Sequence, residues 1–112
     1  MIMKALSVKQ PWASMIASGV KTIETRTWYT EYRGPLLICS SKQPTGQGPT
    51  GKALCVVDLV DCRRMRSGDQ AAAGCVVYEG AYSWVLANVR LVEPFPVKGM
   101  LGLFDVEVQD GS

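Results

Sequence analysis

Three charged side chains stand close together in one short segment, at Lys21, Glu24 and Arg26. The surrounding residues, GVKTIETRTWYT, are rich in β-branched and aromatic side chains and predict a strand. Strand alternation places Glu24, Arg26 and Trp28 on one face, while Lys21 lies near the start of the strand and is free to deviate from that alternation. The three charged groups are therefore expected to converge.

Such a group of charges can do chemistry if it lies in a cleft. Glu24 would pair with Lys21 or Arg26 and hold the orientation of its partner. A desolvated lysine can act as a base, and a carboxylate beside it can accept a proton or activate water. Glu24 and Arg26 could equally form an ordinary ion pair at the end of a strand. The residues alone leave both interpretations open.

The composition of the 112-residue chain excludes several classes of protein. With 47% hydrophobic and 20% charged residues, residues 1–112 are expected to form a single domain with its own core. The absence of histidine excludes a histidine general base, a Ser-His-Asp or Cys-His nucleophile and a histidine-containing zinc site. Any catalysis would use Lys, Glu, Asp, Tyr, Cys or a hydroxyl group, and no cofactor or metal is expected.

The four cysteines, at positions 39, 55, 62 and 75, form no CxxC pair, and we interpret them as reduced core residues. No apolar run approaches the length that crosses a bilayer, so we expect a cytoplasmic protein without a membrane partner. Residues 1–66 carry ten Lys or Arg and four Asp or Glu, whereas residues 67–112 carry two and six, which permits a basic face on the first half. The cluster Arg63, Arg64 and Arg66 could grip phosphates or simply solvate a loop.

The remaining pattern predicts mainly short strands. A helix over residues 11–18 begins at Pro11, where proline is favoured, and Gly19 suits its end. Strands are predicted over residues 3–8, 36–40, 53–61, 81–87, 89–92 and 103–108, with a loop over 41–52, an ambiguous segment over 68–74 and a bend at Pro94 and Pro96. This arrangement indicates a mainly β fold with one or more short helices (α+β), either a small barrel or a strongly curved sheet.

The stretches LSVKQPW, GVKTIETRTWYT and YRGPLLICSSK resemble the ASCH (activating signal cointegrator homology) domain, whose hallmark is G-x-K-x-x-E-x-R after an L-S-x-x-Q-P-W helix start. The later stretches VVDLVDC, AYSWVL and PFPVKGMLGLFDV extend the resemblance over nearly the whole chain. It implies a PUA-like β-barrel whose cleft is lined by the residues of the hallmark. Such domains are associated with RNA-related functions.

Further residues are candidates for binding a ligand in that cleft. Trp12 and Trp84 could line the pocket or pack in the core, and Trp28, beside Tyr29, is the better exposed aromatic candidate for base stacking. Gln10 could offer its amide to a base edge or cap the helix that follows it. The resemblance adds Arg33, Ser40, Ser41, Lys42 and Lys98 as polar or cationic groups near the cleft, each of which could instead be an ordinary loop residue.

The resemblance leaves three functions open. The first is binding of RNA, a single-stranded nucleic acid or a modified nucleoside. The second is an amidohydrolase that removes the acetyl group from acetylcytidine and uses Lys21 and Glu24 as catalytic residues. Relatives with that activity resemble G-x-K-x-x-T, whereas Glu24 stands here in place of the threonine, so the hydroxyl nucleophile is missing from its expected position. The third is a protein-interaction module.

Overall fold

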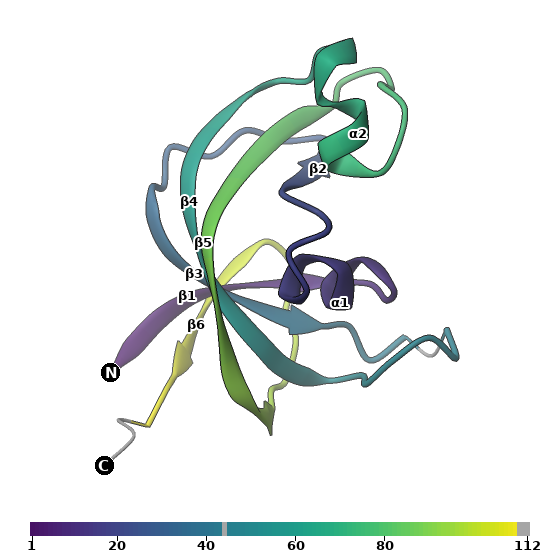
Figure 1. The fold of residues 1–112 in the computed structure, drawn as a ribbon. Coiled ribbons are helices and arrows are strands. Elements are labelled where there is room, and N and C mark those ends of the chain that lie inside the picture. The colour runs from purple at the N-terminus through teal and green to yellow at the C-terminus, as the bar shows by residue number, and fades with distance from the viewer. Residues whose placement is uncertain (44, 110–112) are drawn as a thin grey trace.

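A computed structural model describes residues 1–43 and 45–109. Figure 1 shows the order of the elements in this part of the chain: β1 (Ile2–Val8), α1 (Trp12–Ala17), β2 (Ile23–Arg26), β3 (Gly34–Ser40), β4 (Lys52–Arg64), the 3-10 helix η1 (Ser67–Asp69), α2 (Gln70–Ala73), β5 (Tyr82–Pro96) and β6 (Leu103–Glu107). This confirms the prediction of a mainly β fold with short helices. None of the helices in the described residues has the length and apolar character needed to span a bilayer.

The described strands form one six-stranded sheet in the order β2-β5-β4-β3-β1-β6. β1 runs parallel to β3, and the other neighbouring pairs are antiparallel. The pairing of β4 with β5 shifts register at three places along its length. Bulges bend a strand and increase its twist, so the two long strands arch (Figure 1) and the sheet curls into a half-barrel. This curl carries β2 and α2 over toward the side where α1 lies.

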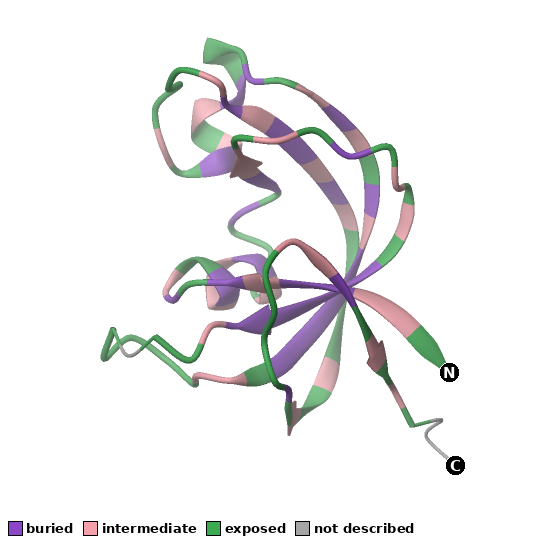
Figure 2. Ribbon diagram, turned by 180° about the vertical axis from the view of Figure 1, so that it is seen from behind, coloured by how far each residue is buried: buried purple, intermediate pink, exposed green. Residues whose placement is uncertain are grey.

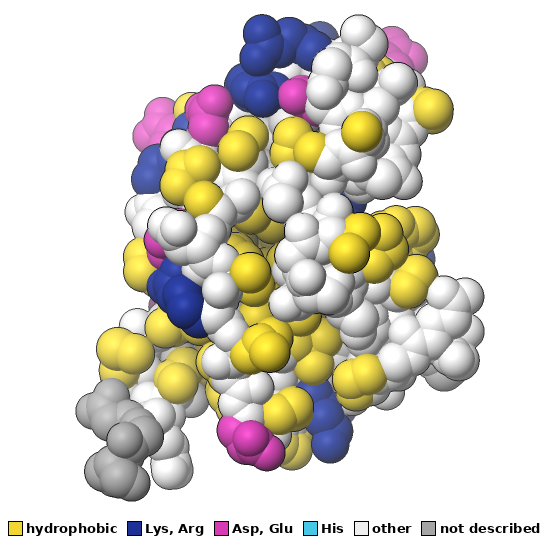
Figure 3. All heavy atoms as spheres, in the orientation of Figure 1, with side chains coloured by type: hydrophobic (Ala, Val, Ile, Leu, Met, Phe, Trp, Pro, Cys, Tyr) yellow, Lys and Arg dark blue, Asp and Glu magenta, His cyan; other side chains and the backbone are white. Residues whose placement is uncertain are grey.

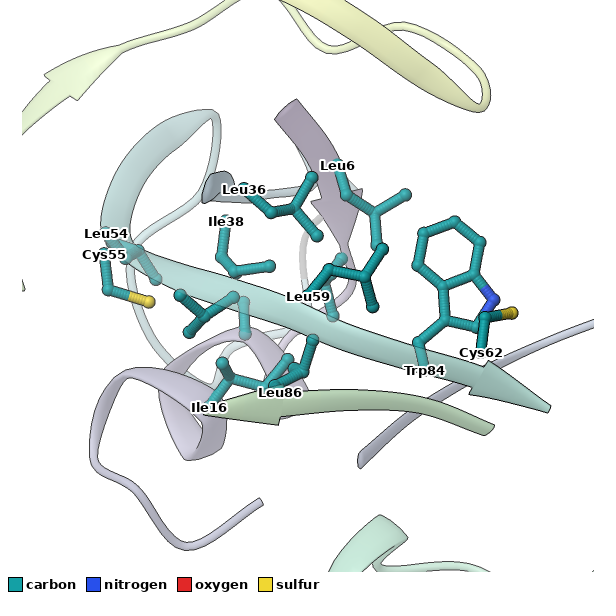
Figure 4. Packing of buried hydrophobic residues seen from close by; sticks show 13 residues of the cluster. Leu6, Ile16, Leu36, Ile38, Leu54, Cys55, Leu59, Cys62, Trp84 and Leu86 are labelled. Atoms are coloured by element: carbon teal, nitrogen blue, oxygen red, sulfur yellow. The ribbon is translucent and has the colours of Figure 1, made fainter. Parts of the chain in front are cut away.

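The core is divided between the two faces of the sheet. Leu36 and Ile38 pack in one cluster with Trp84 (Figure 4), whereas Leu37 and Cys39 pack in a second cluster on the opposite face. Successive side chains of a strand point to opposite faces, so β3 must be apolar at consecutive positions when both faces are covered. This explains the uninterrupted run LLIC, and Figure 2 shows the resulting band of buried residues.

The predicted helix is confirmed with small changes at its ends. Pro11 precedes α1, the side chains of Ala13 and Ile16 are buried, and Gly19 adopts a positive φ of 83°. The left-handed conformation is available to glycine without a steric penalty, and the chain turns there toward β2. α1 thus covers the concave face of the sheet at the point where the chain enters the charged segment.

Two strands, over residues 81–87 and 89–92, and a following bend at Pro94 and Pro96 were predicted, and this prediction was wrong. β5 is continuous from Tyr82 to Pro96. At the predicted break between the two strands, Asn88 adopts a positive φ of 55° without ending the strand. Among the described strands, β2 pairs with β5 only as far as Val85, so beyond that point β5 has β4 as its single neighbour. A proline can occupy such an edge because its missing N–H group costs no ladder hydrogen bond.

The strand limits also differ from the prediction in the segments around the charges. β2 is only four residues long, from Ile23 to Arg26, and β4 extends to Arg64.

Cys39, Cys55 and Cys62 are buried and free, as predicted, whereas Cys75 is only half-buried. Burial raises the pKa of Cys39 to about 12 and that of Cys55 to about 11, so these two thiols stay protonated at neutral pH.

We expect the two-sided packing of β3 to contribute strongly to stability. Ile38 is fully buried, and Ile38→Ala should lower the free energy of unfolding by about 3 kcal/mol because it leaves a cavity in the core. Urea unfolding followed by circular dichroism measures this change. Leu91→Ala, at a side chain that is 74% exposed, is the control and should change stability little. Equal effects of the two substitutions would contradict the packing described here.

Candidate functional site

A cleft of about 820 Å³ opens beside α1, where the end of β1, β2 from Glu24 onward and the turn before β6 come together. This volume lies within the range of small-molecule and cofactor sites. The residues that line it come from five separate segments: Ser7, Val8, Lys9, Trp12, Lys21, Glu24, Thr25, Arg26, Thr27, Ser41, Lys42, Cys75, Tyr78, Gly99, Met100, Leu101 and Gly102.

The predicted triad of charges lies together in this cleft. Glu24 Oε2 accepts hydrogen bonds from Arg26 Nη2 at 3.0 Å and from Arg26 Nε at 3.2 Å. Lys21 Nζ lies 3.6 Å from the other carboxylate oxygen, Oε1. Both Lys21 and Glu24 are buried, whereas the Arg26 side chain is 24% exposed. The carboxylate thus bridges two cations, and the prediction that Glu24 pairs with Lys21 or Arg26 is confirmed for both.

Backbone carbonyl groups hold the two cations in place. Lys21 Nζ donates a hydrogen bond to the carbonyl of Ala73, the last residue of α2. Arg26 Nη2 donates to the Ser7 carbonyl at 2.8 Å, so the triad connects α2, β2 and β1. In the described part of the chain, Nη1 of Arg26 makes no hydrogen bond, and this nitrogen keeps both donors for a ligand. The fold therefore orients the Arg26 guanidinium but does not use all of its hydrogen-bond donors.

The aromatic residues differ in their relation to the cleft. Trp12 is 42% exposed and lines the cleft. Trp84 is fully buried, and its ring packs edge-on against Trp28 with the centroids 4.7 Å apart. The expectation that Trp28 is the better exposed ring is therefore corrected: β2 ends at Arg26, so residue 28 no longer follows strand alternation and its side chain turns to the core. Tyr29, which is half-exposed, packs against Tyr82 and also does not line the cleft.

Gln10 caps α1, one of the two roles considered for it. Its Oε1 accepts the backbone N–H of Ser14 at 2.9 Å, and its Nε2 donates to Ser14 Oγ and to the Pro49 carbonyl, each at 2.8 Å. A Cβ atom at Gly48 would lie only 2.8 Å from this nitrogen, so the loop approaches closely because glycine stands there. The buried amide thus fastens the loop that carries Ser41 and Lys42 to the helix that carries Trp12.

The other predicted polar residues divide between the cleft and its surroundings. Ser41 and Lys42 line the cleft, whereas the Ser40 hydroxyl is buried and bonds with the backbone of Lys52. Arg33 donates to the carbonyls of Thr30 and Tyr32 and lies outside the cleft. Lys98 is exposed and does not line it, although the next four residues do.

One wall of the cleft was not predicted. Tyr78 Oη donates a hydrogen bond to Thr25 Oγ1 at 3.0 Å, and Cys75 Sγ lies 3.9 Å from the same hydroxyl. Lys9 and the turn over residues 99–102 also line the cleft and were not among the predicted ligand-binding residues. Cys75 and Tyr78 are at least fifty positions from Thr25 in the sequence, and no local pattern marks them as its neighbours. Lys9 could have been predicted as a cleft residue, because it directly precedes Gln10 beside the start of the helix.

The arginine cluster lies away from the cleft, and at least one of its side chains serves the fold. Figure 3 shows these basic side chains gathered where β4 leads into η1. Arg63 Nη1 donates to Asp69 at 2.5 Å, and Asp69 also accepts from the Ser83 hydroxyl and the backbone N–H of Arg66. The hydrogen bond from Arg63 is the main reason why the pKa of Asp69 lies well below its usual range. The Arg64 guanidinium lies over the ring of Tyr82, 5.6 Å from its centroid.

These features define a small, mainly β half-barrel domain with a charged cleft beside its first helix. The chain belongs to the ASCH domain family, whose model matches residues 6–96. Lys21, Glu24 and Arg26 lie within this range and line the cleft.

Two kinds of relative support this assignment. The chain is 31% identical to activating signal cointegrator 1 of Homo sapiens and 30% identical to that of Mus musculus, in each case over 84% of this chain and 20% of the relative. It therefore spans about a fifth of the length of these relatives. The ASCH crystal structure from Zymomonas mobilis superposes with a TM-score of 0.74 at 14% identity, covering 94% of this chain and 87% of that one. A variant of that protein gives a TM-score of 0.70 with 94% and 88% coverage. At this identity the likeness shows the fold alone.

The bridging carboxylate should matter for stability. Glu24→Gln keeps the shape of the side chain but leaves the buried Lys21 and the partly buried Arg26 without a counter-charge. We expect the free energy of unfolding to fall by roughly 3 kcal/mol, because removing one member of a buried ion pair leaves an uncompensated charge. Urea unfolding measures it. The control is Glu107→Gln in an exposed pair with the N-terminus, which should change stability by less than about 1 kcal/mol. A loss no larger than in the control would contradict this role for Glu24.

The Asp69 site should make stability depend on pH. Because its pKa is depressed in the folded state, the unfolded chain binds a proton first, and the stabilisation present at neutral pH is lost as pH falls below the ordinary value for Asp. Asp69→Asn should cost about 2 kcal/mol at pH 7, as expected for hydrogen bonds to a charged group, and should show a shallower loss of stability between pH 5 and pH 2. Thermal unfolding across this range measures both. Asp105→Asn, at an exposed surface pair, serves as the control. Parallel pH profiles for wild type and Asp69→Asn would disprove the assignment.

Proposed function

We propose that the chain binds RNA or a modified nucleoside in this cleft, with Lys21, Glu24 and Arg26 at its base. The observation that carries the proposal is that the Arg26 guanidinium is held in a fixed orientation and still has unused hydrogen-bond donors. Its guanidinium is held by Glu24 and by the Ser7 carbonyl, while Nη1 keeps its donors. A pre-oriented guanidinium binds phosphate or the acceptors of a base with little loss of side-chain entropy.

The rim of the cleft adds positive charge to that base. Lys9 and Lys42 are exposed and line the cleft from two different segments. Lys21 and Arg26 already compensate the negative charge of Glu24. The electrostatic field that a ligand meets in the cleft is therefore positive. Lysines at the rim attract a polyanion and release its counterions on binding. Membership of the ASCH family supports the same proposal, because the PUA-like fold implied for it is associated with RNA-related functions.

The arrangement favours binding over the amidohydrolase alternative. Lys21 Nζ is committed to the Ala73 carbonyl and to Glu24, and Glu24 is committed to Arg26. A proton transfer between either group and a substrate would have to compete with these contacts. Thr25 supplies a hydroxyl in the cleft, and its Oγ1 accepts a hydrogen bond from Tyr78. In the described part of the chain no Lys, Asp or Glu side chain takes part in a hydrogen bond with this hydroxyl, as a general base that activates it would.

The proposal predicts how affinity for RNA changes with charge. A fluorescently labelled single-stranded RNA of about 12 nucleotides, long enough to cover a typical single-strand site, is titrated and followed by anisotropy. Arg26→Gln should weaken binding about tenfold or more, because it removes charge-assisted hydrogen bonds. Lys9→Gln and Lys42→Gln should each lower the slope of log affinity against log salt by about 0.7. Thermal unfolding verifies that each variant is folded.

Arg90→Gln is the matched control for this experiment. Arg90 is an exposed arginine that pairs with Asp58 outside the cleft, so its removal changes the net charge by the same amount. Equal weakening by Arg90→Gln and Arg26→Gln would mean that the cleft is not the binding site. Release of acetate from acetylcytidine by the wild type, abolished in Lys21→Ala, would establish the hydrolase instead. Absence of binding to RNA and to nucleosides would favour the protein-interaction module.

A further inference from the structure

Three apolar side chains stand at the mouth of the cleft. Trp12 is 42% exposed, Met100 is 61% exposed and Leu101 is 99% exposed, and all three line the cleft. Single exposed apolar residues are common on protein surfaces, but these gather around one concave site together with cationic groups. The pattern is that of a subsite for a ligand that is both apolar and anionic.

The turn that carries Met100 and Leu101 is held at its base. Gly99 lies against β1, where a Cβ atom would come within 3.1 Å of Ser7 Oγ, and the Val97 N–H bonds to the Gly51 carbonyl at 2.9 Å. Gly102 closes the turn with φ at 68°. Figure 2 shows this segment passing from β5 to β6 beside α1, which begins at Trp12. The fold therefore delivers a leucine and a tryptophan, from segments almost ninety positions apart, to the same opening.

The chemistry of the surrounding residues selects the ligand. An aromatic ring and an aliphatic side chain at one opening suit a flat apolar group, which stacks on the ring. Lys9 is three positions from Trp12 in the sequence, and Lys42 and Arg26 line the same cleft, so the flat group should carry a phosphate nearby. A nucleotide combines these properties. In a duplex both faces of each base are covered by neighbouring bases, so only an unpaired base can enter.

We propose that Trp12 and Leu101 contact the two faces of one unpaired nucleobase, and that this subsite makes the cleft select single strands over duplexes. The inference rests on the proposed function, since the phosphate beside the base is held by the cations of the same cleft. Met100 extends the apolar edge of the turn next to Leu101. Thr25 and Tyr78 line the same cleft, and their hydroxyls are left for polar edges of the ligand.

Three probes test this subsite: a single-stranded RNA of about 12 nucleotides, an abasic oligonucleotide of equal length and charge, and a blunt RNA duplex, compared by anisotropy at one salt concentration. The wild type should bind the single strand at least tenfold more tightly than either of the others. Trp12→Ala and Leu101→Ser should each weaken binding of the single strand about fivefold or more and leave binding of the abasic strand unchanged. Trp12→Phe should retain most of the affinity, because a phenyl ring still stacks.

Leu91→Ser is the matched control, because Leu91 is a 74% exposed leucine on β5 outside the cleft. Equal affinity of the wild type for the RNA and the abasic strand, or for the RNA and the duplex, would overturn the base subsite. In that case a loss of abasic-strand binding in Arg26→Gln would leave the proposed function standing. Failure to bind any of the three probes would overturn both proposals. Equal weakening by Leu91→Ser and Leu101→Ser would also overturn the subsite.

Discussion

The cleft depends on one carboxylate that holds two cations. Glu24 brings together Lys21, which reaches the end of α2, and Arg26, which reaches the end of β1. Removing these charges from water costs free energy, and only the mutual attraction and the carbonyl acceptors offset it. A polar network therefore joins three segments, and it adds to the apolar cluster in which Ile23 of β2 packs with Ala73 of α2. A site built in this way keeps a charged group oriented toward a ligand without covering it.

The curvature of the sheet is the second requirement for the cleft. β4 and β5 are long, and the shifts in their pairing bend them over, so that β2 at one edge of the sheet approaches β1 near the other edge. A flat sheet in the same strand order would separate these edges by four strand spacings, and Arg26 would not reach the Ser7 carbonyl. The local irregularities at Asn88 and along β4 thus contribute to the site although none of them lines it.

The charged part of the candidate site could be predicted from the sequence, whereas much of its aromatic part could not. Lys21, Glu24 and Arg26 lie within six positions, and strand geometry alone brings at least two of them together. The position of Trp28 depends instead on where β2 ends, and the strand ends two residues before it. Strand ends are decided by the partner strand, and Arg26 pairs with Tyr82, which is the first residue of β5.

The sequence by itself determined the mainly β class, the helix after Pro11, the apolar strand that forms β3 and the charged segment, because each of these follows from neighbouring residues and their periodicity. Only the tertiary structure decided that Trp12 lines the cleft, that Gln10 serves as a cap bonded to the loop at Pro49, and that Tyr78 meets Thr25. It also placed Leu101, rather than Lys98, in the cleft. These arrangements join segments far apart in the chain, and the bulged, curled sheet that brings them together has no signature in any single segment.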